Sequence, residues 1–169
     1  MKRIIFLDFD GVLNTENYQA HLSRQGMPQW DEFGQLFDPF AVENLRLILE
    51  AFPDALLVIN SSWKLEGLGR MKELWASRKL PGRIHSITPD YVPDLANLDL
   101  ADENDIAFLA GKGNEVKQWL VMNAPGECRY VVLDDVPFFP KEMASHFIQI
   151  NPETGITKED VEKAIHILK

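Results

Sequence analysis

Residues 4–14, IIFLDFDGVLN, carry a run of large apolar side chains directly into two aspartates that one residue separates. The aspartates are Asp8 and Asp10, and Gly11 follows the second one. A short apolar run with these boundaries is typical of a strand covered on both faces, and glycine lets the backbone turn tightly away from it. The segment therefore predicts a central strand that ends in a pair of carboxylates.

Four more short runs rich in Ile, Val, Leu or Phe are bounded by charged residues or by Pro and Gly. Helical patterns lie between most of these runs, and such alternation implies parallel strands joined by right-handed crossovers. The sequence thus predicts an α/β fold: a three-layer, open parallel five-stranded sheet with helices on both faces and ligands bound beyond the carboxyl ends of the strands. The predicted strands are residues 3–7, 55–59, 83–87, 129–133 and 146–150.

Capping residues predict where three of the helices begin. Asp38 is a typical N-cap before a proline at the first helical position, Pro39, and Thr157 with Asp160 has the spacing of a capping box. Apolar residues recur at helical spacing behind both caps. Asn114 is the predicted N-cap of the helix that precedes the fourth strand.

Two segments do not follow the alternation of strand and helix. We expect a single domain over residues 1–169, with a small flap insertion at about 15–37 and an acidic loop insertion at about 88–111. Three aromatic residues lie in the first insertion, Trp30, Phe33 and Phe37. At least two of them are expected to pack on the core.

The composition is that of an ordinary globular domain, with a net charge of -9 at pH 7. An acidic chain without a cluster of lysines and arginines repels nucleic-acid phosphates. The single cysteine, Cys128, fits a reducing compartment, and no apolar run approaches the roughly 20 residues that span a bilayer. We therefore expect a cytoplasmic protein without a membrane partner, and the sequence gives no indication of its oligomeric state.

The fourth predicted strand ends like the first, because RYVVLDDVP places Asp134 and Asp135 directly after an apolar run. The carboxyl ends of parallel strands meet at one edge of a sheet. Two like charges about 4 Å apart cost on the order of 4 kcal/mol at an effective dielectric of about 20, so such a site requires a shared proton or a cation. Carboxylate oxygens are ligands that suit Mg²⁺, which is commonly shared with a substrate phosphate.

Hydroxyl groups follow the second predicted strand. In LLVINSSWK, Ser61 and Ser62 could bind the oxygens of a phosphoryl group through their hydroxyls and backbone N–H groups. The alternative is that one serine only caps the next helix, and for Ser62 the two interpretations are equally consistent with the sequence. Lys112 precedes the helix before the fourth strand and is a candidate for the fixed cation that a cluster of acids needs.

The order of these motifs resembles the haloacid dehalogenase (HAD) superfamily of phosphohydrolases. The shared elements are LDFDGVL, a strand that ends in serine, a lysine at a helix start, and a strand that ends in Asp-Asp. Within this superfamily, the chain is most similar to small, nearly capless members related to the phosphatase-like domain of RNA-repair proteins. The segments that carry this similarity are SSWK, Thr88-Pro89 and GKGNEVKQWL before LDD. The chain departs from this group at two positions: arginine is expected where Lys64 stands and is frequent where Lys112 stands. Because of these departures, Lys117 and Lys64 remain alternatives to Lys112 as the lysine of the third motif.

The resemblance implies a Rossmann-like HAD fold and assigns the two aspartates of the first strand. Asp8 would attack phosphorus and form an aspartyl-phosphate. Asp10 would protonate the leaving oxygen and later deprotonate the hydrolytic water. Mg²⁺ would be held by Asp8, the backbone carbonyl of Asp10, and Asp134, with Asp135 acting through water or as a supporting partner.

By the same resemblance, Ser61 and Lys112 would orient the phosphoryl oxygens and stabilise the transferring group. The leading hypothesis is a Mg²⁺-dependent phosphomonoesterase that acts on a small phosphorylated metabolite or nucleotide. One alternative is a nucleic-acid end-processing phosphatase, which the acidity of the chain disfavours but leaves open. Another is a fold that binds a phosphorylated ligand or a partner without turnover.

Overall fold

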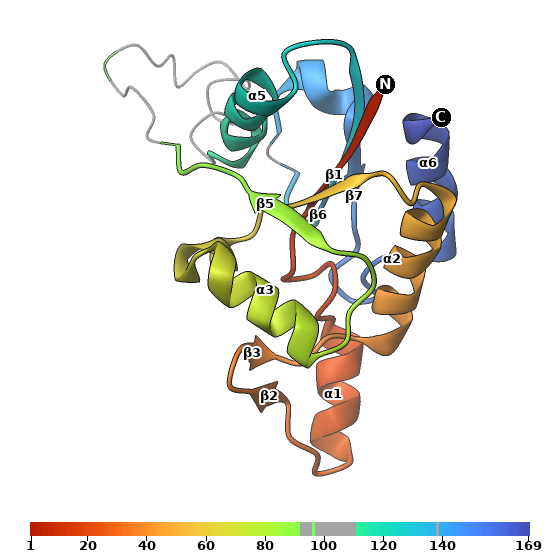
Figure 1. The fold of residues 1–169 in the computed structure, drawn as a ribbon. Helices are drawn as coiled ribbons and strands as arrows, with labels where there is room; N and C mark the ends of the chain where they lie inside the picture. Colours follow the sequence, from red (N-terminus) through yellow and green to blue (C-terminus); the bar gives the residue numbers. More distant parts are fainter. Residues whose placement is uncertain (92–95, 97–110, 138) are drawn as a thin grey trace.

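The computed structural model describes residues 1–91, 96, 111–137 and 139–169. Its main sheet has five strands in the order β5-β4-β1-β6-β7, and every neighbouring pair is parallel. The α/β prediction is confirmed, as are all five predicted strands (Figure 1). Their bounds are β1 Lys2–Leu7, β4 Leu56–Ile59, β5 Ile84–Ile87, β6 Cys128–Asp134 and β7 Phe147–Gln149.

Helices cover both faces of this sheet, which gives the expected three layers. The helices α2 (Pro39–Ala51), α3 (Leu68–Ser77) and α6 (Lys158–Leu168) supply side chains to one core cluster. The second cluster, on the other face, contains side chains of α5 (Lys112–Asn123) and of the 3₁₀ helix η3 (Lys141–His146). Figure 1 shows α2 and α6 side by side, away from α5.

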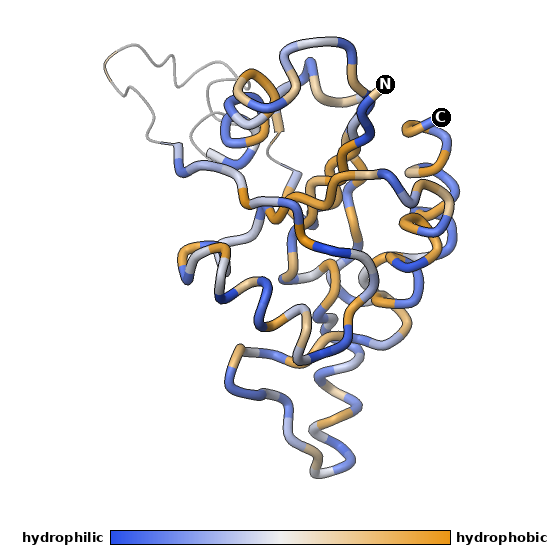
Figure 2. The backbone as a smooth tube through the Cα atoms, viewed as in Figure 1, coloured by the Kyte–Doolittle hydropathy of each residue, from blue (hydrophilic) through white to orange (hydrophobic). Residues whose placement is uncertain are grey.

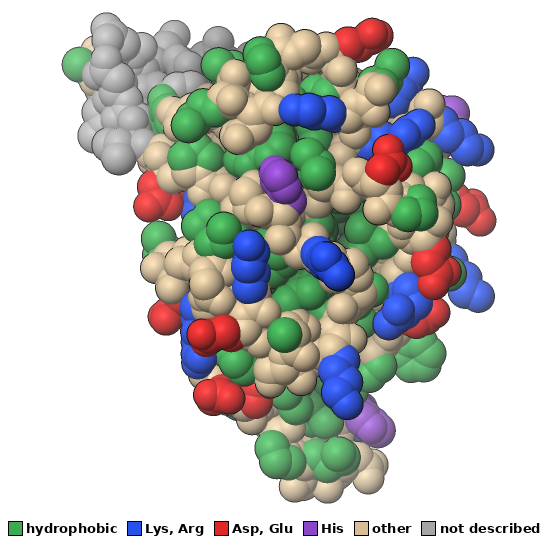
Figure 3. Space-filling view, viewed as in Figure 1, with side chains coloured by type: hydrophobic (Ala, Val, Ile, Leu, Met, Phe, Trp, Pro, Cys, Tyr) green, Lys and Arg blue, Asp and Glu red, His purple; other side chains and the backbone are tan. Residues whose placement is uncertain are grey.

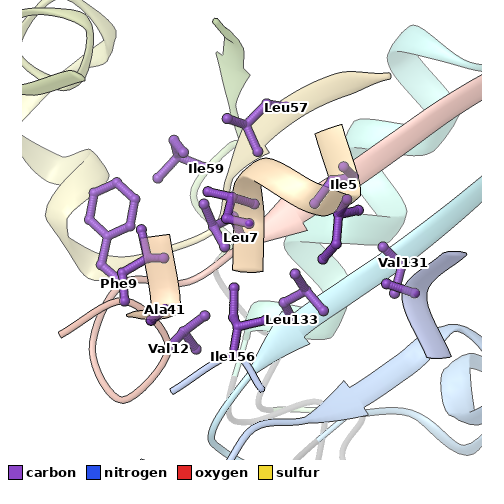
Figure 4. Close-up of a cluster of buried hydrophobic side chains, with 14 of the residues drawn as sticks. Ile5, Leu7, Phe9, Val12, Ala41, Leu57, Ile59, Val131, Leu133 and Ile156 are labelled. Carbon is purple, nitrogen blue, oxygen red and sulfur yellow. The ribbon is translucent and has the colours of Figure 1, made fainter. Parts of the chain in front are cut away.

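The central strand β1 is buried on both faces, as its unbroken apolar run predicts. Ile5 and Leu7 belong to the first core cluster (Figure 4), whereas Ile4 and Phe6 belong to the second. The Phe6 ring meets the edge of Trp119 with a centroid separation of 5.3 Å. Figure 2 shows the same contrast between hydrophobic central strands and more polar outer helices. A strand packed on both faces gives a rigid support to the residues that follow it.

Two of the three predicted helix starts are confirmed. The Asp38 side chain accepts a hydrogen bond from the Phe40 N–H at the start of α2, and Thr157 and Asp160 form the capping box of α6. The prediction for Asn114 is wrong, because α5 begins at Lys112 with Gly111 as its N-cap. Gly111 has a φ of 79°, a conformation that glycine adopts easily, and it starts the helix ahead of Asn114.

The first insertion contains more regular structure than its sequence suggests. It forms the helix α1 (Glu16–Arg24) and an antiparallel hairpin of β2 (Trp30–Asp31) and β3 (Gly34–Gln35), which lie together at the bottom of Figure 1. Phe37 is buried and Phe33 packs against the core, whereas Trp30 is 62% exposed, so the expectation that at least two of the three aromatic residues pack is confirmed.

The second predicted insertion, at 88–111, lies mostly outside the described residues. Thr88, at its beginning, is buried and extends the sheet, because its N–H donates to the carbonyl of Ile59. Within the described ranges, every helix is too short or too polar to cross a lipid bilayer.

Candidate active site

The first and fourth predicted strands are neighbours in the sheet, and this pairing brings their terminal carboxylates together. Leu7 of β1 is in register with Leu133 of β6, and the Asp8 N–H donates to the Leu133 carbonyl at 3.0 Å. Asp8, Asp134 and Asp135 each place a carboxylate oxygen within 4.8 Å of the others. Asp8 and Asp134 are almost completely buried. The structure therefore collects three of the four predicted carboxylates in one cluster.

Lys112, the first residue of α5, joins two members of this cluster. Its Nζ donates to Asp8 Oδ2 at 2.8 Å and to Asp134 Oδ2 at 2.7 Å. The other oxygens of these carboxylates accept backbone N–H groups: Asp8 Oδ1 from Phe9 and Asp134 Oδ1 from Val136. Each of the two carboxylates is thus fixed at both oxygens.

The two alternative lysines lie elsewhere. Lys117 pairs with Glu142 on the exposed side of α5. Lys64 is buried, and its Nζ lies 2.8 Å from Glu115 Oε2 and donates to Thr88 Oγ1 at 3.1 Å. Among the three candidates, Lys112 is the one in contact with the carboxylate cluster.

Burial makes the negative charge of the cluster energetically unfavourable. Burial raises the pKa of Asp8, with Lys112 acting in the opposite direction. Burial and then the charge of Asp8 raise the pKa of Asp134 to about 7. Burial lowers the pKa of Lys112, but the charges of Asp8 and Asp134 outweigh it and raise that pKa overall. Three carboxylates beside one ammonium group therefore favour a further cation, and their hard oxygen atoms fit Mg²⁺.

Gly11 allows the loop after β1 to approach Asp135. Its φ is 73°, and a Cβ atom at this position would lie 2.5 Å from Asp135 Oδ2. A side chain at position 11 would therefore both strain the backbone and displace the carboxylate. The glycine of the DFDG motif is required here by this close approach as well as by the turn.

Asp10 lies outside the cluster of three carboxylates, and its side chain is exposed. Asn14 Nδ2 donates to Asp10 Oδ1 at 2.8 Å, and Trp63 Nε1 lies 3.2 Å from both carboxylate oxygens. A pocket of about 560 Å³ is lined by Asp10 and Trp63 together with apolar residues that include Phe33 and Leu65. Sequence reasoning missed both partners of Asp10; the only signal was the tryptophan within SSWK.

The two serines have different surroundings. Ser61 is buried, and its Oγ accepts the Trp63 N–H at 3.3 Å as the N-cap of the 3₁₀ helix η1 (Ser62–Glu66). Ser62 is exposed on the first turn. The capping role that the sequence left open for Ser62 therefore belongs to Ser61, whose hydroxyl can accept this bond and still donate its own proton.

An open parallel sheet with buried carboxylates and a lysine at its carboxyl edge fits the class of HAD-type domains. Residues 4–161 match the family described as the HAD domain in Swiss Army Knife RNA repair proteins, and the chain belongs to this family. The resemblance stated from the motifs is thereby confirmed. Membership supports a phosphatase-type hydrolase at the level of the family.

Solved structures agree with the fold. The HAD domain of the effector protein Lem4 from Legionella pneumophila is 16% identical, with a TM-score of 0.52 over 99% of this chain and 96% of that one. An inactive mutant of the same domain is 15% identical, with a TM-score of 0.52 over 100% of this chain and 95% of that one. At this identity the likeness shows the fold alone. No protein with a curated description matches the chain.

Proposed function

We propose that this chain is a Mg²⁺-dependent phosphatase that hydrolyses a phosphomonoester through phosphorylation of Asp8. The observation that supports the proposal most directly is the shared contact of Lys112 with Asp8 and Asp134. Through this contact, Lys112 holds the buried carboxylate of Asp8 at the end of the central strand. Further carboxylates that can bind a divalent cation lie beside it. A nucleophile, a fixed positive charge and a cation site are the parts that phosphoryl transfer requires.

Asp8, Asp134 and Asp135 would hold the ion, and the backbone carbonyl of Asp10 would complete the set. When bound, Mg²⁺ supplies positive charge that offsets the negative charge of the phosphoryl group. Lys112 and Ser61 bind the oxygens of the transferring group from the protein side. Ser62 can add a contact from the exposed turn.

In the first step, a carboxylate oxygen of Asp8 forms a bond to phosphorus as the bond from phosphorus to the leaving oxygen breaks. Asp10 donates its proton to that oxygen, so the leaving group departs as an alcohol. In the second step, Asp10 takes a proton from water, and the water oxygen attacks phosphorus. The bond between phosphorus and Asp8 then breaks, which releases phosphate and restores both aspartates.

A small substrate is favoured by the surroundings of Asp10. The pocket of about 560 Å³ on its side has room for the body of a small phosphorylated metabolite or a nucleotide. A net charge of -9 opposes the approach of a long polyanion.

A second candidate function is the removal of a phosphate from an RNA or DNA end, with a partner protein that recruits the nucleic acid. The family description, with its reference to RNA repair proteins, favours this candidate. A third function, binding of a phosphorylated ligand without turnover, would need the same anion-binding groups but not the reactivity of Asp8.

The test is a hydrolysis screen over sugar phosphates, nucleotides and phosphorylated oligonucleotides, with Mg²⁺ and with EDTA. We expect turnover with Mg²⁺, its loss in EDTA, and a loss of at least about 10³-fold in Asp8→Asn. Thermal unfolding of Asp8→Asn checks that the variant is folded. Full activity of folded Asp8→Asn would contradict the proposed nucleophile, and no turnover of any substrate by the wild-type protein would favour the binding function.

A further inference from the structure

The indole group of Trp63 connects the proposed acid-base residue to the aromatic core. We propose that Trp63 is a positioning residue for Asp10, holding its carboxyl group in the orientation that proton transfer to the leaving oxygen requires. This inference rests on the proposed function of Asp10. It extends the function by naming a residue outside the motif aspartates on which the acid step depends.

The contact is a hydrogen bond to a side chain that has few other restraints. Asp10 is exposed, and an exposed aspartate can sample several rotamers. Trp63 Nε1 lies 3.2 Å from both Oδ1 and Oδ2, while Asn14 Nδ2 adds a bond to Oδ1 at 2.8 Å. The indole N–H is equidistant from the two carboxyl oxygens, and the Asn14 amide contacts only Oδ1. Together the two donors restrict the carboxyl group to one orientation.

The indole ring itself is held on several sides. Phe9 meets it edge-on with a centroid separation of 5.4 Å, and Phe37 lies 5.7 Å away. The backbone of Gly34 passes so close that a Cβ atom there would be 2.7 Å from Trp63 Cη2. Phe9 and Phe37 are buried in the core, so the position of the N–H donor is set by rigid packing. A donor that is already oriented loses little entropy when it binds the carboxylate.

The same ring also forms part of the wall of the pocket beside Asp10. A leaving group that enters this pocket lies next to the indole and the carboxyl group together. Trp63 therefore orients the acid on the side from which the leaving oxygen departs. A general acid in good geometry contributes about 10²- to 10⁴-fold to a rate, so loss of the orientation is measurable.

The test replaces Trp63 with phenylalanine, which keeps an aromatic ring but removes the N–H donor. Trp75→Phe is the matched control, since Trp75 also packs on Phe9, with a centroid separation of 6.1 Å, but its Nε1 donates to the Pro81 carbonyl at 2.9 Å. Values of kcat/KM are measured for an alkyl phosphate, whose leaving oxygen needs a proton, and for p-nitrophenyl phosphate, whose leaving group departs without one.

We expect Trp63→Phe to lower kcat/KM for the alkyl phosphate by about 30-fold and for p-nitrophenyl phosphate by less than about threefold. Trp75→Phe should affect the two esters equally. An equal loss on both esters in Trp63→Phe would show a merely structural role and overturn the inference, as would no loss on either. The alkyl phosphate is one that the hydrolysis screen identifies as a substrate. If the wild-type protein turns over no substrate in that screen, the phosphatase proposal fails first, and the role of Trp63 fails with it.

A second readout is independent of turnover. The indole N–H resonance of Trp63 is compared by NMR in the wild-type protein and in Asp10→Ala, with the Trp75 resonance as reference. We expect the Trp63 resonance to move and its exchange with solvent to become faster in the variant. An unchanged Trp63 resonance would show that the hydrogen bond is absent in solution and would overturn the inference.

Discussion

Two lysines on the same helix have opposite surroundings. Lys112 contacts the buried carboxylates of Asp8 and Asp134, whereas Lys117 pairs with Glu142 at the surface of α5. Removing one partner of a buried ion pair leaves charge without compensation, while exposed pairs contribute little. The position of each lysine along α5 therefore decides how much its charge contributes to stability and activity.

Substitution of Lys112 by methionine is expected to lower the free energy of unfolding by about 3 kcal/mol at neutral pH in the absence of metal. It is also expected to lower kcat/KM by at least about 100-fold, because the proposed contact of its charge with the phosphoryl group would be lost. Lys117→Met should cost less than about 1 kcal/mol and leave kcat/KM unchanged. Urea unfolding and steady-state kinetics measure both quantities, and similar values for the two variants would contradict the assignment of Lys112.

Gly11 and Gly26 share a positive φ but differ in what surrounds them. A Cβ atom at Gly11 would meet Asp135 Oδ2, whereas nothing lies within 4 Å of a Cβ atom at Gly26. We expect Gly11→Ala and Gly26→Ala each to lose about 1 kcal/mol from backbone strain. Only Gly11→Ala should displace Asp135 and raise the Mg²⁺ concentration for half-maximal activity. Equal Mg²⁺ requirements in the two variants would show that Asp135 does not support the metal site.

The sequence predicts site residues that lie at the end of a strand or at the start of a helix. It does not predict residues that only tertiary packing brings to the site. Asp8 and Asp134 could be predicted because Asp8 directly follows the buried strand β1 and Asp134 ends the buried strand β6. The pairing of these two strands follows from the fold class. Trp63 lies 53 positions from Asp10 along the chain, and only the folded structure brings its indole to that carboxylate. A sequence has no local pattern for such a contact.

Among the elements, the hairpin of β2 and β3 is held by two arginines, Arg70 of α3, which donates to the Glu32 carbonyl at 3.0 Å, and Arg78. Arg78, at the end of α3, donates to Asp31 Oδ1 at 2.7 Å and to the carbonyls of Gly34 and Gln35. Its guanidinium also lies over the Phe37 ring, 4.4 Å from the centroid. Arg78 thus ties both strands of the hairpin to the main domain, next to the Gly34 backbone that packs on Trp63.

The pairing of Arg78 with Asp31 gives a pH-dependent contribution to stability. Hydrogen bonding to Arg78 lowers the pKa of Asp31 from its ordinary value of 3.8. Because the folded state has the lower pKa, the contribution is fully present above the unfolded pKa and is lost as the pH falls through the folded value. Asp31→Asn is therefore expected to destabilise the protein by about 1 kcal/mol at neutral pH and by progressively less below pH 3.8.

The matched control for this prediction is Asp54→Asn, since Asp54 pairs with Arg3 at 3.4 Å from an exposed position. Urea unfolding over a pH series gives the free energy for both variants. We expect the difference from the wild-type protein to depend on pH more strongly at Asp31 than at Asp54. A pH-independent loss in Asp31→Asn would show that the ion pair does not stabilise the hairpin.

The elements that could be predicted are those with strong periodic or unbroken apolar patterns. The central strands β1, β4 and β6 are mostly buried and appear as apolar runs, whereas the edge strands β5 and β7 are partly buried and have shorter apolar patterns. Helix α1 has only Leu22 buried and thus shows no apolar stripe, and β2 and β3 are only two residues long. The hairpin is held by the side chains of Arg70 and Arg78, which lie far from it along the chain, so a local pattern in residues 15–37 does not reveal it.

Over the whole molecule, net charge bears on the proposed choice between a small substrate and a polynucleotide. The net charge is -9, and acidic and basic side chains are both scattered over the face shown in Figure 3. The carboxylate cluster adds negative charge at the site itself. Long-range repulsion of a polyanion by an acidic protein is screened by salt, with a Debye length of about 10 Å at 0.1 M.

This screening gives opposite predictions for the two candidate substrates. A nucleic-acid enzyme with a basic surface loses affinity steeply as salt displaces its phosphate contacts. For this acidic chain, we expect kcat/KM on a phosphorylated oligonucleotide to rise about two- to fivefold as KCl increases from about 50 to 300 mM, because repulsion is screened. Hydrolysis of the corresponding mononucleotide, measured at the same Mg²⁺ concentration, should change by less than about twofold, since a small anion experiences less of the protein's total charge. A steep fall on the oligonucleotide with a flat response on the mononucleotide would instead require basic contacts along the nucleic acid, and would make end processing the better account of this chain.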